Sequence, residues 1–226
     1  MTTRIAVLTT CYNDGQFLEA CIASVMAQTC QDHEHILVDN GSTDHTAEIL
    51  WARHRVLWHR ANVCVPRVLN EAVRSSIAPW CVILNADDEF VPDALETILR
   101  VADQHPGVNC IFSPWQWMGA RADVYDCAPY TGDARMLTEH QVPGIRAFRR
   151  DLWDALGGED ESIAVGADWD WAVRAAACGL LNPFKVERPL WRVRHFGDGQ
   201  KDRLSAQCDH RALRAHMAQH FAAVPC

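Results

Sequence analysis

Several features that would assign a chain to a special class are missing from this sequence of 226 residues. No apolar run approaches the roughly 18–20 residues needed to span a bilayer, and the first four residues lead into a strand-like segment instead of a signal peptide. A content of 49% hydrophobic and 22% charged residues excludes disorder, collagen-like repeats and low complexity. No internal repeat or linker is present. We therefore expect one cytoplasmic domain with a full core.

Paired metal-ligand spacing is also scarce. The ten cysteines contain no CxxC pair, so we interpret nearly all of them as small buried hydrophobes in a reducing compartment. Among the eleven histidines, only His216 and His220 show a convincing ligand spacing, which argues against a histidine-based metal protein. The net charge of −8 argues against a general nucleic-acid surface. This charge is uneven, because residues 1–184 carry −12 and residues 185–226 carry +4.

The first half of the chain alternates strand and helix signals. Short apolar runs predict buried strands at 5–8, 35–38, 56–58 and 80–84, with helical spacing at 18–26, up to residue 50, at 68–73 and at 95–99. The alternation predicts an α/β fold with a mostly parallel sheet covered by helices on both faces. The second half predicts strands at 108–112, 124–127, 145–149 and 186–193, and helices at 151–156, 169–178 and 205–221.

Polar clusters follow three of the predicted strands. They occupy residues 10–14, 39–44 and 85–88, after the first, second and fourth strands. Because ligands of parallel sheets bind at the carboxyl ends of the strands, these clusters predict one site at one sheet edge.

Six segments lie in a fixed order along the chain. They are LTTCYND at 8–14, SVMAQT at 24–29, VDNGSTD at 38–44, WCVILNADD at 80–88, FRRDLW at 148–153 with Gly157 and Gly158 after it, and ADWDWAVR at 167–174. In these segments the chain resembles the inverting glycosyltransferases of family 2, which have the GT-A fold, a Rossmann-like nucleotide-diphospho-sugar transferase fold. The resemblance covers about residues 4–195.

The resemblance implies a donor, an acceptor and a division of the chain. The donor is a nucleotide sugar, by default a UDP-sugar, and the acceptor is a glycan, a lipid-linked molecule or a small molecule. We expect a GT-A domain at 1–199, with a nucleotide-binding half at about 1–112 and an acceptor half at about 113–199. Residues 200–226 are expected to form an amphipathic helix packed on that domain, or in peripheral contact with an anionic membrane.

The resemblance also implies a divalent cation, Mn²⁺ or Mg²⁺, at the third polar cluster. Hard cations take carboxylate oxygens, and Asp87 matches the terminal Asp of the family's DxD motif, with Asp88 adjacent. The first carboxylate of the motif is replaced by Asn85, which can bond a ribose hydroxyl but carries no charge. His195 matches a further ligand of some members. The alternatives are that the two aspartates only cap a following helix and that His195 is an ordinary histidine.

Nucleotide contacts are implied at the first two polar clusters. Asp39 matches the position that accepts the imide N–H of a uracil or thymine, unless it only forms the turn. Thr10 and Tyr12 match residues that line the base and ribose pocket, Tyr12 by stacking. Arg67 is a candidate that does not align cleanly. Asn85, Ala86 and Asp87 complete the nucleotide-binding set.

Inverting transfer needs a general base for the acceptor hydroxyl. Asp168 matches the family's base at the start of the late helix, and Ala167 replaces the Glu that usually precedes it. Asp170 is expected to support the helix terminus, with acceptor contact as a weaker assignment. Trp115 and Trp117 are weighed as acceptor contacts, since aromatic faces stack on sugars, against a role in the core.

Two other functions compete with glycosyl transfer. A nucleotidyltransferase would open with a Gly-rich basic loop after the first strand, which residues 10–15 lack. A non-catalytic sugar-nucleotide-binding module would explain the substitutions at Asn85 and Ala167.

Overall fold

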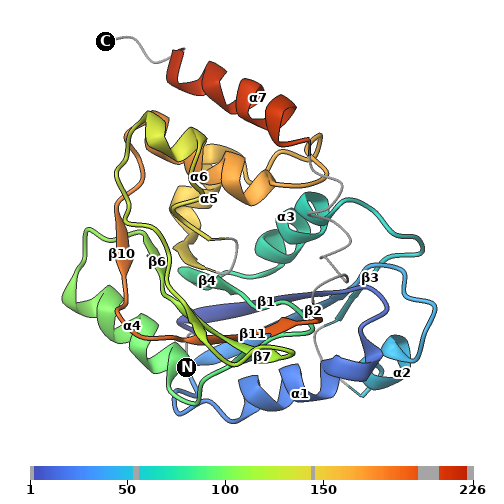
Figure 1. Cartoon of the computed structure of the whole chain (residues 1–226). Helices are drawn as coiled ribbons and strands as arrows, with labels where there is room; N and C mark the ends of the chain where they lie inside the picture. Colours follow the sequence, from blue (N-terminus) through green and yellow to red (C-terminus); the bar gives the residue numbers. More distant parts are fainter. Residues whose placement is uncertain (1–2, 53–55, 144–145, 198–208, 223–226) are drawn as a thin grey trace.

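The structure, a computed structural model, describes residues 3–52, 56–143, 146–197 and 209–222. The elements are β1 (Ile5–Cys11), α1 (Gly15–Met26), β2 (His33–Asp39), α2 (Thr46–Leu50), β3 (Val56–Trp58), α3 (Val65–Ser75), β4 (Trp80–Ile83), β5 (Glu89–Phe90), α4 (Ala94–Gln104), β6 (Cys110–Phe112), β7 (Trp115–Gly119), β8 (Val124–Tyr125), η1 (Ala134–Leu137), β9 (Ala147–Arg149), α5 (Arg150–Leu156), α6 (Ala167–Ala177), β10 (Pro183–Lys185), β11 (Trp191–His195) and α7 (His210–Ala222). They form two sheets with helices around them (Figure 1).

The larger sheet has the strand order β10-β6-β9-β4-β1-β2-β3. β1 pairs in parallel with β2 and with β4, so that Ile5 lies opposite both His33 and Trp80. β2 with β3 and β6 with β10 are also parallel, and β9 runs antiparallel to β4 and β6. The predicted α/β fold with a mostly parallel sheet is confirmed.

Helices cover both faces of the larger sheet, with α3, α5 and α6 on one side and α1 and α2 on the other (Figure 1). Along β1, Ala6 and Leu8 join the core formed with α3, α5 and α6. Ile5 and Val7 join the core formed with α1 and α4. Because successive side chains of a strand point to opposite faces, a strand covered on both faces needs an unbroken apolar run. All four residues have no exposed surface.

The smaller sheet, β5-β11-β7-β8, differs from the sequence-based expectation. The predicted strand 186–193 is right only for residues 191–193. β10 ends before residue 186, and β11 begins at Trp191, after Pro189, which has no N–H to donate to a strand ladder. β5 and β7 were not expected. The predicted strands 108–112 and 124–127 are shorter in the structure, where they are β6 and β8. Residue 145 of the predicted strand 145–149 lies outside the described residues.

α7 packs on α6 at the end of the molecule farthest from α1 (Figure 1). Leu213 and Met217 are buried, whereas Arg211 and Arg214 are exposed. The Leu213 and Met217 side chains therefore face the domain. Its predicted start at residue 205 lies outside the described residues, and so do Lys201 and Arg203 of the positively charged region 185–226. In the part of the chain that is described, no helix has the length and apolar character needed to cross a membrane.

Candidate active site

The carboxyl ends of β1 and β2 lie side by side, and their loops are tied together. Cys11, the last residue of β1, is paired with Asp39, the last residue of β2. In the β1 loop, Asn13 adopts a φ of 59°, a left-handed conformation that Asn tolerates better than most residues. Its Oδ1 accepts the Thr43 N–H of the β2 loop at 2.7 Å. The two loops thus form one continuous rim.

The candidate nucleotide residues on this rim differ in exposure. Asp39 is buried, and one of its oxygens accepts the Ser42 N–H at 3.1 Å, so it does shape the turn. That bond uses one of two carboxylate oxygens. Thr10 is half-buried, and the Tyr12 ring is 43% exposed, which suits a stacking surface. Base recognition by Asp39 stays a prediction.

The turn after β4 brings the third polar cluster to the same edge. Asp88 donates its N–H to the Asn85 carbonyl at 3.1 Å, and the Asn85 amide donates to Asp88 Oδ2 at 2.9 Å. Asp88 Oδ1 accepts the Arg194 N–H at 2.9 Å. Asp88 and Ala86 are buried, and Asp87 is half-buried. Asp88 therefore faces the interior, which corrects the expectation of two adjacent open ligands.

The helix-capping alternative for this turn is also wrong. The residues that follow Asp88 are β5, not a helix, and α4 starts only after Asp93. The Asn85 substitution has a structural consequence here, since an amide N–H can donate to Asp88 where a second carboxylate would repel it.

Carboxyl groups lie close together where the three loops meet. Burial and the neighbouring Asp87 raise the pKa of Asp88 to about 8. Asp14, in the β1 loop, has its pKa raised to about 6, first by burial and then by Asp87 and Asp44. These mutual effects place the Asp87 carboxylate within electrostatic reach of the β1 loop. Carboxylates crowded in this way suit a cation.

Arg194 of β11 approaches this turn from the smaller sheet. Its Nε donates to the Asp87 carbonyl at 3.0 Å, and its guanidinium lies 4.6 Å from the centre of the Phe17 ring on α1. The guanidinium also lies 3.7 Å from the Glu89 carboxylate. Arg194 is thus a fixed positive charge beside the Asp87 turn.

In the described part of the chain, no contact joins Arg67 to the loops after β1, β2 and β4. It lies on α3 and is 53% exposed, with its Nε bonded to Glu71 at 3.1 Å one turn later. Glu71 also contacts His59 at 3.0 Å. The structure gives Arg67 an intrahelical ion pair, and nucleotide contact by Arg67 stays a prediction.

The tryptophans of β7 form an aromatic wall with the neighbouring strands. Trp115 stacks on Tyr125 with ring centres 4.2 Å apart, and Trp117 meets Trp115 edge-on at 5.5 Å. His195 meets the Trp117 ring edge-on at 5.3 Å, and its Nδ1 lies 3.1 Å from the Gly197 N–H. Both tryptophans are half-buried. Acceptor contact by Trp115 or Trp117 and metal ligation by His195 stay predictions.

Asp168 lies in the first turn of α6 and is 32% exposed, so it can meet a substrate. His140 Nε2 lies 3.6 Å from Asp168 Oδ2, and the His140 ring stacks on Trp169 with centres 5.3 Å apart. Burial lowers the pKa of His140. At this distance the two side chains make no hydrogen bond, and His140 Nε2 is buried without a hydrogen-bond partner in the described part of the chain. Sequence reasoning missed His140, because it lies 28 positions before Asp168 in a segment without motifs.

Asp170 is not an acceptor contact. It has no exposed surface, and its Oδ2 accepts a bond from Arg174 Nε at 2.7 Å. Its Oδ1 faces His220 Nε2 at 3.0 Å. Since a substrate cannot reach a fully buried carboxylate whose oxygens are engaged, the acceptor assignment is wrong. The expectation that Asp170 supports the helix agrees better with these contacts.

A buried ion pair packs against α6. Arg146 and Glu159 are both buried, with Arg146 Nη2 lying 3.1 Å from Glu159 Oε1. The Arg146 guanidinium lies 4.4 Å from the Trp171 ring centre. Burial raises the pKa of Glu159 to about 7. Neither residue was expected from the sequence, since charged residues rarely lie in a core.

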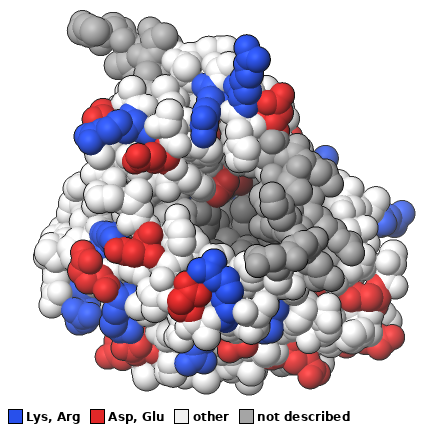
Figure 2. All heavy atoms as spheres, viewed as in Figure 1, with Lys and Arg blue, Asp and Glu red and all other residues white. Residues whose placement is uncertain are grey.

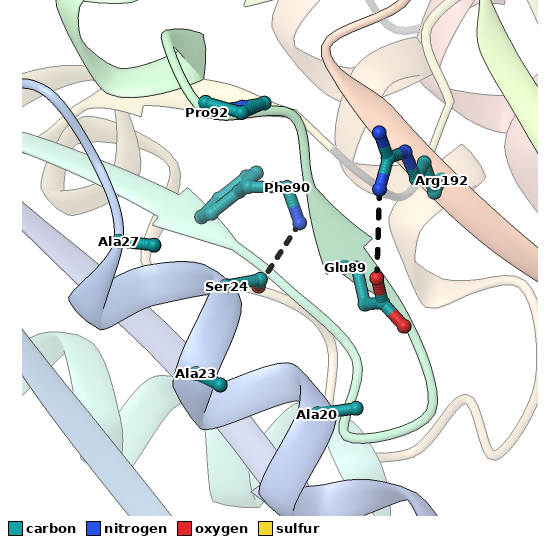
Figure 3. Close-up of a pocket in the computed structure, with 8 residues that line it drawn as sticks. All are labelled: Ala20, Ala23, Ser24, Ala27, Glu89, Phe90, Pro92 and Arg192. Atoms are coloured by element: carbon teal, nitrogen blue, oxygen red, sulfur yellow. Dashed lines mark hydrogen bonds and ion pairs between the residues drawn. The ribbon is translucent and has the colours of Figure 1, made fainter.

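The surface has more than one concavity. Figure 2 shows a hollow in the face viewed, with acidic atoms in its wall. A separate groove of about 310 Å³ lies between α1 and β5 (Figure 3), where Ser24 Oγ accepts the Phe90 N–H at 3.1 Å and Arg192 lies 3.8 Å from Glu89. The residues that line this groove include none of the predicted nucleotide, metal or base residues.

The fold is that of solved GT-A glycosyltransferases. Staphylococcus aureus TarS (residues 1–349, in complex with UDP-GlcNAc) superposes with a TM-score of 0.78 at 13% identity over 100% of this chain and 68% of its own. The mannosyltransferase PcManGT from Pyrobaculum calidifontis, in complex with GDP-Man and Mn²⁺, superposes with a TM-score of 0.67 at 21% identity over 98% and 64%.

The family follows from the sequence match. A model of Glycosyl transferase family 2 matches residues 6–154, so the chain belongs to this family. An uncharacterized glycosyltransferase of Haemophilus influenzae is 23% identical over 82% of this chain and 66% of its own length. A PGL/p-HBAD biosynthesis glycosyltransferase of Mycobacterium bovis is 27% identical over 78% and 69%. The chain thus spans about two thirds of the length of these relatives.

Proposed function

We propose that this chain transfers a glycosyl group from a nucleotide-diphosphate sugar to an acceptor hydroxyl, with inversion at the anomeric carbon. The observation that carries the proposal is the convergence of the loops after β1, β2 and β4, where Asp39 and Asp87 lie at one sheet edge of a family 2 chain. UDP is the proposed nucleotide. TarS, which binds UDP-GlcNAc, supports that choice, whereas PcManGT binds GDP-Man.

The residues at the Asp87 turn fit a divalent cation. Asp87 and Asp14 crowd negative charge that raises the pKa values of their neighbours, and a cation would relieve that repulsion. Asp87 would hold the ion, and Asn85 would contribute an amide oxygen or bond the ribose. A bound Mn²⁺ or Mg²⁺ supplies positive charge for the leaving diphosphate. PcManGT was solved with Mn²⁺.

The protein's own groups account for the rest of the reaction. Asp168 accepts the proton of the acceptor hydroxyl as that oxygen attacks the anomeric carbon. His140, whose Nε2 lies 3.6 Å from Asp168 Oδ2, is proposed as a positioning residue for that carboxylate. Arg194, fixed against Asp87 and Phe17, lies where it can balance charge that develops on the diphosphate. Trp115 and Trp117 are proposed to form a stacking surface for the acceptor.

The boundaries of the chain's parts are proposed in the same way. Residues 1–199 form the transferase domain, and residues 200–226 contain the helix that packs on it. A cytoplasmic location stays a prediction. Peripheral membrane contact also stays a prediction, and the burial of Leu213 and Met217 weakens its physical basis.

The test is nucleotide release by the full chain. The protein is incubated with UDP-sugars, Mn²⁺ and candidate acceptors, and released UDP is measured for the wild type, Asp168→Asn and the control Asp151→Asn, an exposed aspartate outside the site. Loss of a general base lowers kcat by roughly 10²- to 10⁴-fold. Equal release by the wild type and Asp168→Asn would remove Asp168 as the base and favour the binding-module alternative.

Calorimetry with UDP and Mn²⁺ tests the donor end separately. Asp87→Ala is expected to weaken binding by at least about 100-fold, whereas Asp168→Asn leaves it unchanged. Unchanged affinity in Asp87→Ala would place the cation elsewhere. Release of pyrophosphate from a nucleoside triphosphate and a sugar phosphate would instead indicate a nucleotidyltransferase.

A further inference from the structure

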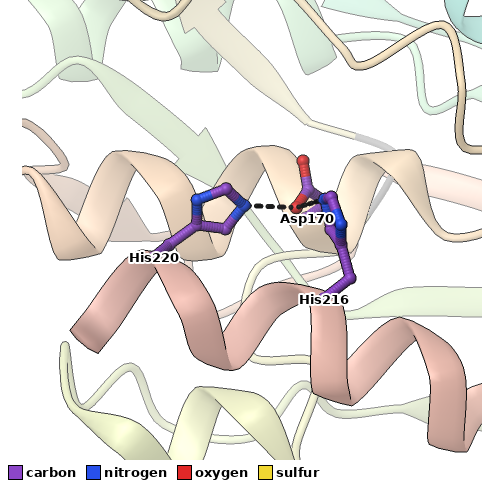
Figure 4. Close-up of side chains that lie close together, drawn as sticks. All are labelled: Asp170, His216 and His220. Atoms are coloured by element: carbon purple, nitrogen blue, oxygen red, sulfur yellow. Dashed lines mark hydrogen bonds and ion pairs between the residues drawn. The ribbon is translucent and has the colours of Figure 1, made fainter. Parts of the chain in front are cut away.

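A cluster of metal-ligand side chains lies outside the donor site, between α6 and α7. His216 and His220 are one turn apart on α7 and point toward Asp170 on α6 (Figure 4). Residues four positions apart on a helix share a face, so both imidazoles reach the same carboxylate. The sequence shows the histidine pair but not the aspartate, which is 46 positions before His216.

The distances in this cluster match those between ligands of one small ion. His220 Nε2 lies 3.0 Å and His216 Nε2 lies 3.5 Å from Asp170 Oδ1. One ligand atom from each residue lies within 4.8 Å of the others. Tetrahedral zinc with bonds of about 2.0–2.1 Å separates its ligand atoms by about 3.3 Å. The three side chains thus need only small rotamer adjustments to bind one ion.

One nitrogen of this cluster is buried without a hydrogen bond. The nearest nitrogen of His216, Nε2, is buried and makes no hydrogen bond within the described part of the chain. Asp170 is fully buried; Arg174 bonds its Oδ2, and its Oδ1 faces the nitrogens of His216 and His220. A buried polar atom without a partner is costly. The two histidine side chains are 40% and 28% accessible, so the cluster lies close to the surface.

The types of ligand atom also select the metal. Imidazole nitrogen suits zinc and its late first-row neighbours, whereas Mg²⁺ and Mn²⁺ prefer oxygen ligands. We propose that Asp170, His216 and His220 bind one Zn²⁺ ion, with water as the fourth ligand. The site is distinct from the Asp87 turn.

The ion would link α6 to α7. α7 is otherwise held by apolar contacts such as Leu213, whose side chain lies against Gly166 at the start of α6. Zinc adds a bond network from α7 to Asp170, two residues after Asp168. Binding therefore fixes the first turn of α6, which presents the proposed base.

Metal titration of the full chain tests this site. Protein freed of metal with EDTA is titrated with ZnCl₂ in a calorimeter, using Asp87→Ala as the background so that the donor site does not contribute. His216→Gln and His220→Gln are compared in this background with His210→Gln, a change of an exposed histidine on the same helix. We expect one Zn²⁺ per chain in the background protein and in the His210 variant, and at least about 100-fold weaker binding in the other two.

Two measurements keep the test decisive if a variant folds poorly. Co²⁺ bound to the metal-free background protein should give the intense visible absorption of a tetrahedral site, and Zn²⁺ should remove it. The background protein should also gain roughly 5–10 °C in Tm at a hundredfold excess of Zn²⁺ over Kd. Zinc binding unchanged in both histidine variants, or no Co²⁺ spectrum and no gain in Tm, overturns the proposal. Neither result affects the proposed transferase, which is read from UDP release.

Discussion

Replacing Arg146 by Met is expected to destabilise the protein in a way that depends on pH. Arg146 and Glu159 form a buried ion pair at 3.1 Å, and the Arg146 guanidinium lies over Trp171 of α6. Met fills much of the same space but carries no charge. In Arg146→Met, Glu159 therefore stays buried without its cation, and its pKa rises further above the value of about 7 in the wild type.

The direction in which stability changes with pH follows from the uptake of protons on folding. The pKa of Glu159 is about 7 in the folded protein and 4.5 in the unfolded reference, so the folded state binds more protons between these values. In the wild type this group's stability contribution is present below pH 4.5 and lost as the pH rises through about 7. In the variant the loss continues above pH 7, because Glu159 resists ionisation.

The same pKa values give the loss of unfolding free energy in Arg146→Met. At pH 5.5 Glu159 is protonated in both folded proteins, and the variant loses only the contacts of Arg146, about 1–2 kcal/mol. Above pH 7 the difference grows by about 1.4 kcal/mol per pH unit. At pH 8.5 the total cost is about 3–4 kcal/mol, within the range for breaking a buried ion pair.

Urea unfolding at pH 5.5 and pH 8.5 measures this difference. Glu159→Gln and the double variant complete a cycle in which other titrating groups cancel. In the Glu159→Gln background, the cost of Arg146→Met should not vary with pH. A cost in the wild-type background that is equal at both pH values, or larger at pH 5.5, would refute the reasoning.

Three further changes have defined outcomes. Gly158→Ala should lower the free energy of unfolding in urea by about 2–3 kcal/mol, because φ is 83° and a Cβ would collide with the Asn70 side chain of α3. Gly157→Ala, with a φ of 73° but open space around a Cβ, should cost about 1 kcal/mol. Equal costs would show that the collision is relieved. His140→Phe keeps the stacking on Trp169 but removes the nitrogen near Asp168, so kcat for UDP release should fall about tenfold with the donor KM unchanged; an unchanged kcat excludes a positioning role. Asn85→Asp adds a carboxylate to the β4 turn and should strengthen Mn²⁺ binding in calorimetry about tenfold; weaker binding would mean that repulsion within the turn prevails.

The first half of the fold could be predicted from the sequence because its signals are local. The run Ile5–Leu8 is apolar at every position, and burial on both faces of a parallel sheet requires this. The turn at residues 85–88 follows such a run. Its place at the carboxyl edge, beside the loop of Asp39, then follows from the parallel connections.

The second half was less predictable because its strands are short and depend on partners far along the chain. β11 pairs with β7, so that Trp191 lies opposite Trp115. No periodicity within residues 186–195 indicates that pairing, and Pro189 divides the apolar pattern that suggested a single strand.

The sequence by itself determined the family, the sheet and the identities of the candidate base and metal ligand, since these rest on residue order and on local burial patterns. Only the tertiary structure decided how side chains far apart in sequence are used. It turned Asp88 inward against Arg194, placed His140 beside Asp168, and buried Asp170 under α7. The physical reason is that exposure and charge pairing are set by which faces meet after the helices and sheets have packed. A local pattern records that an element is buried, but not what it is buried against.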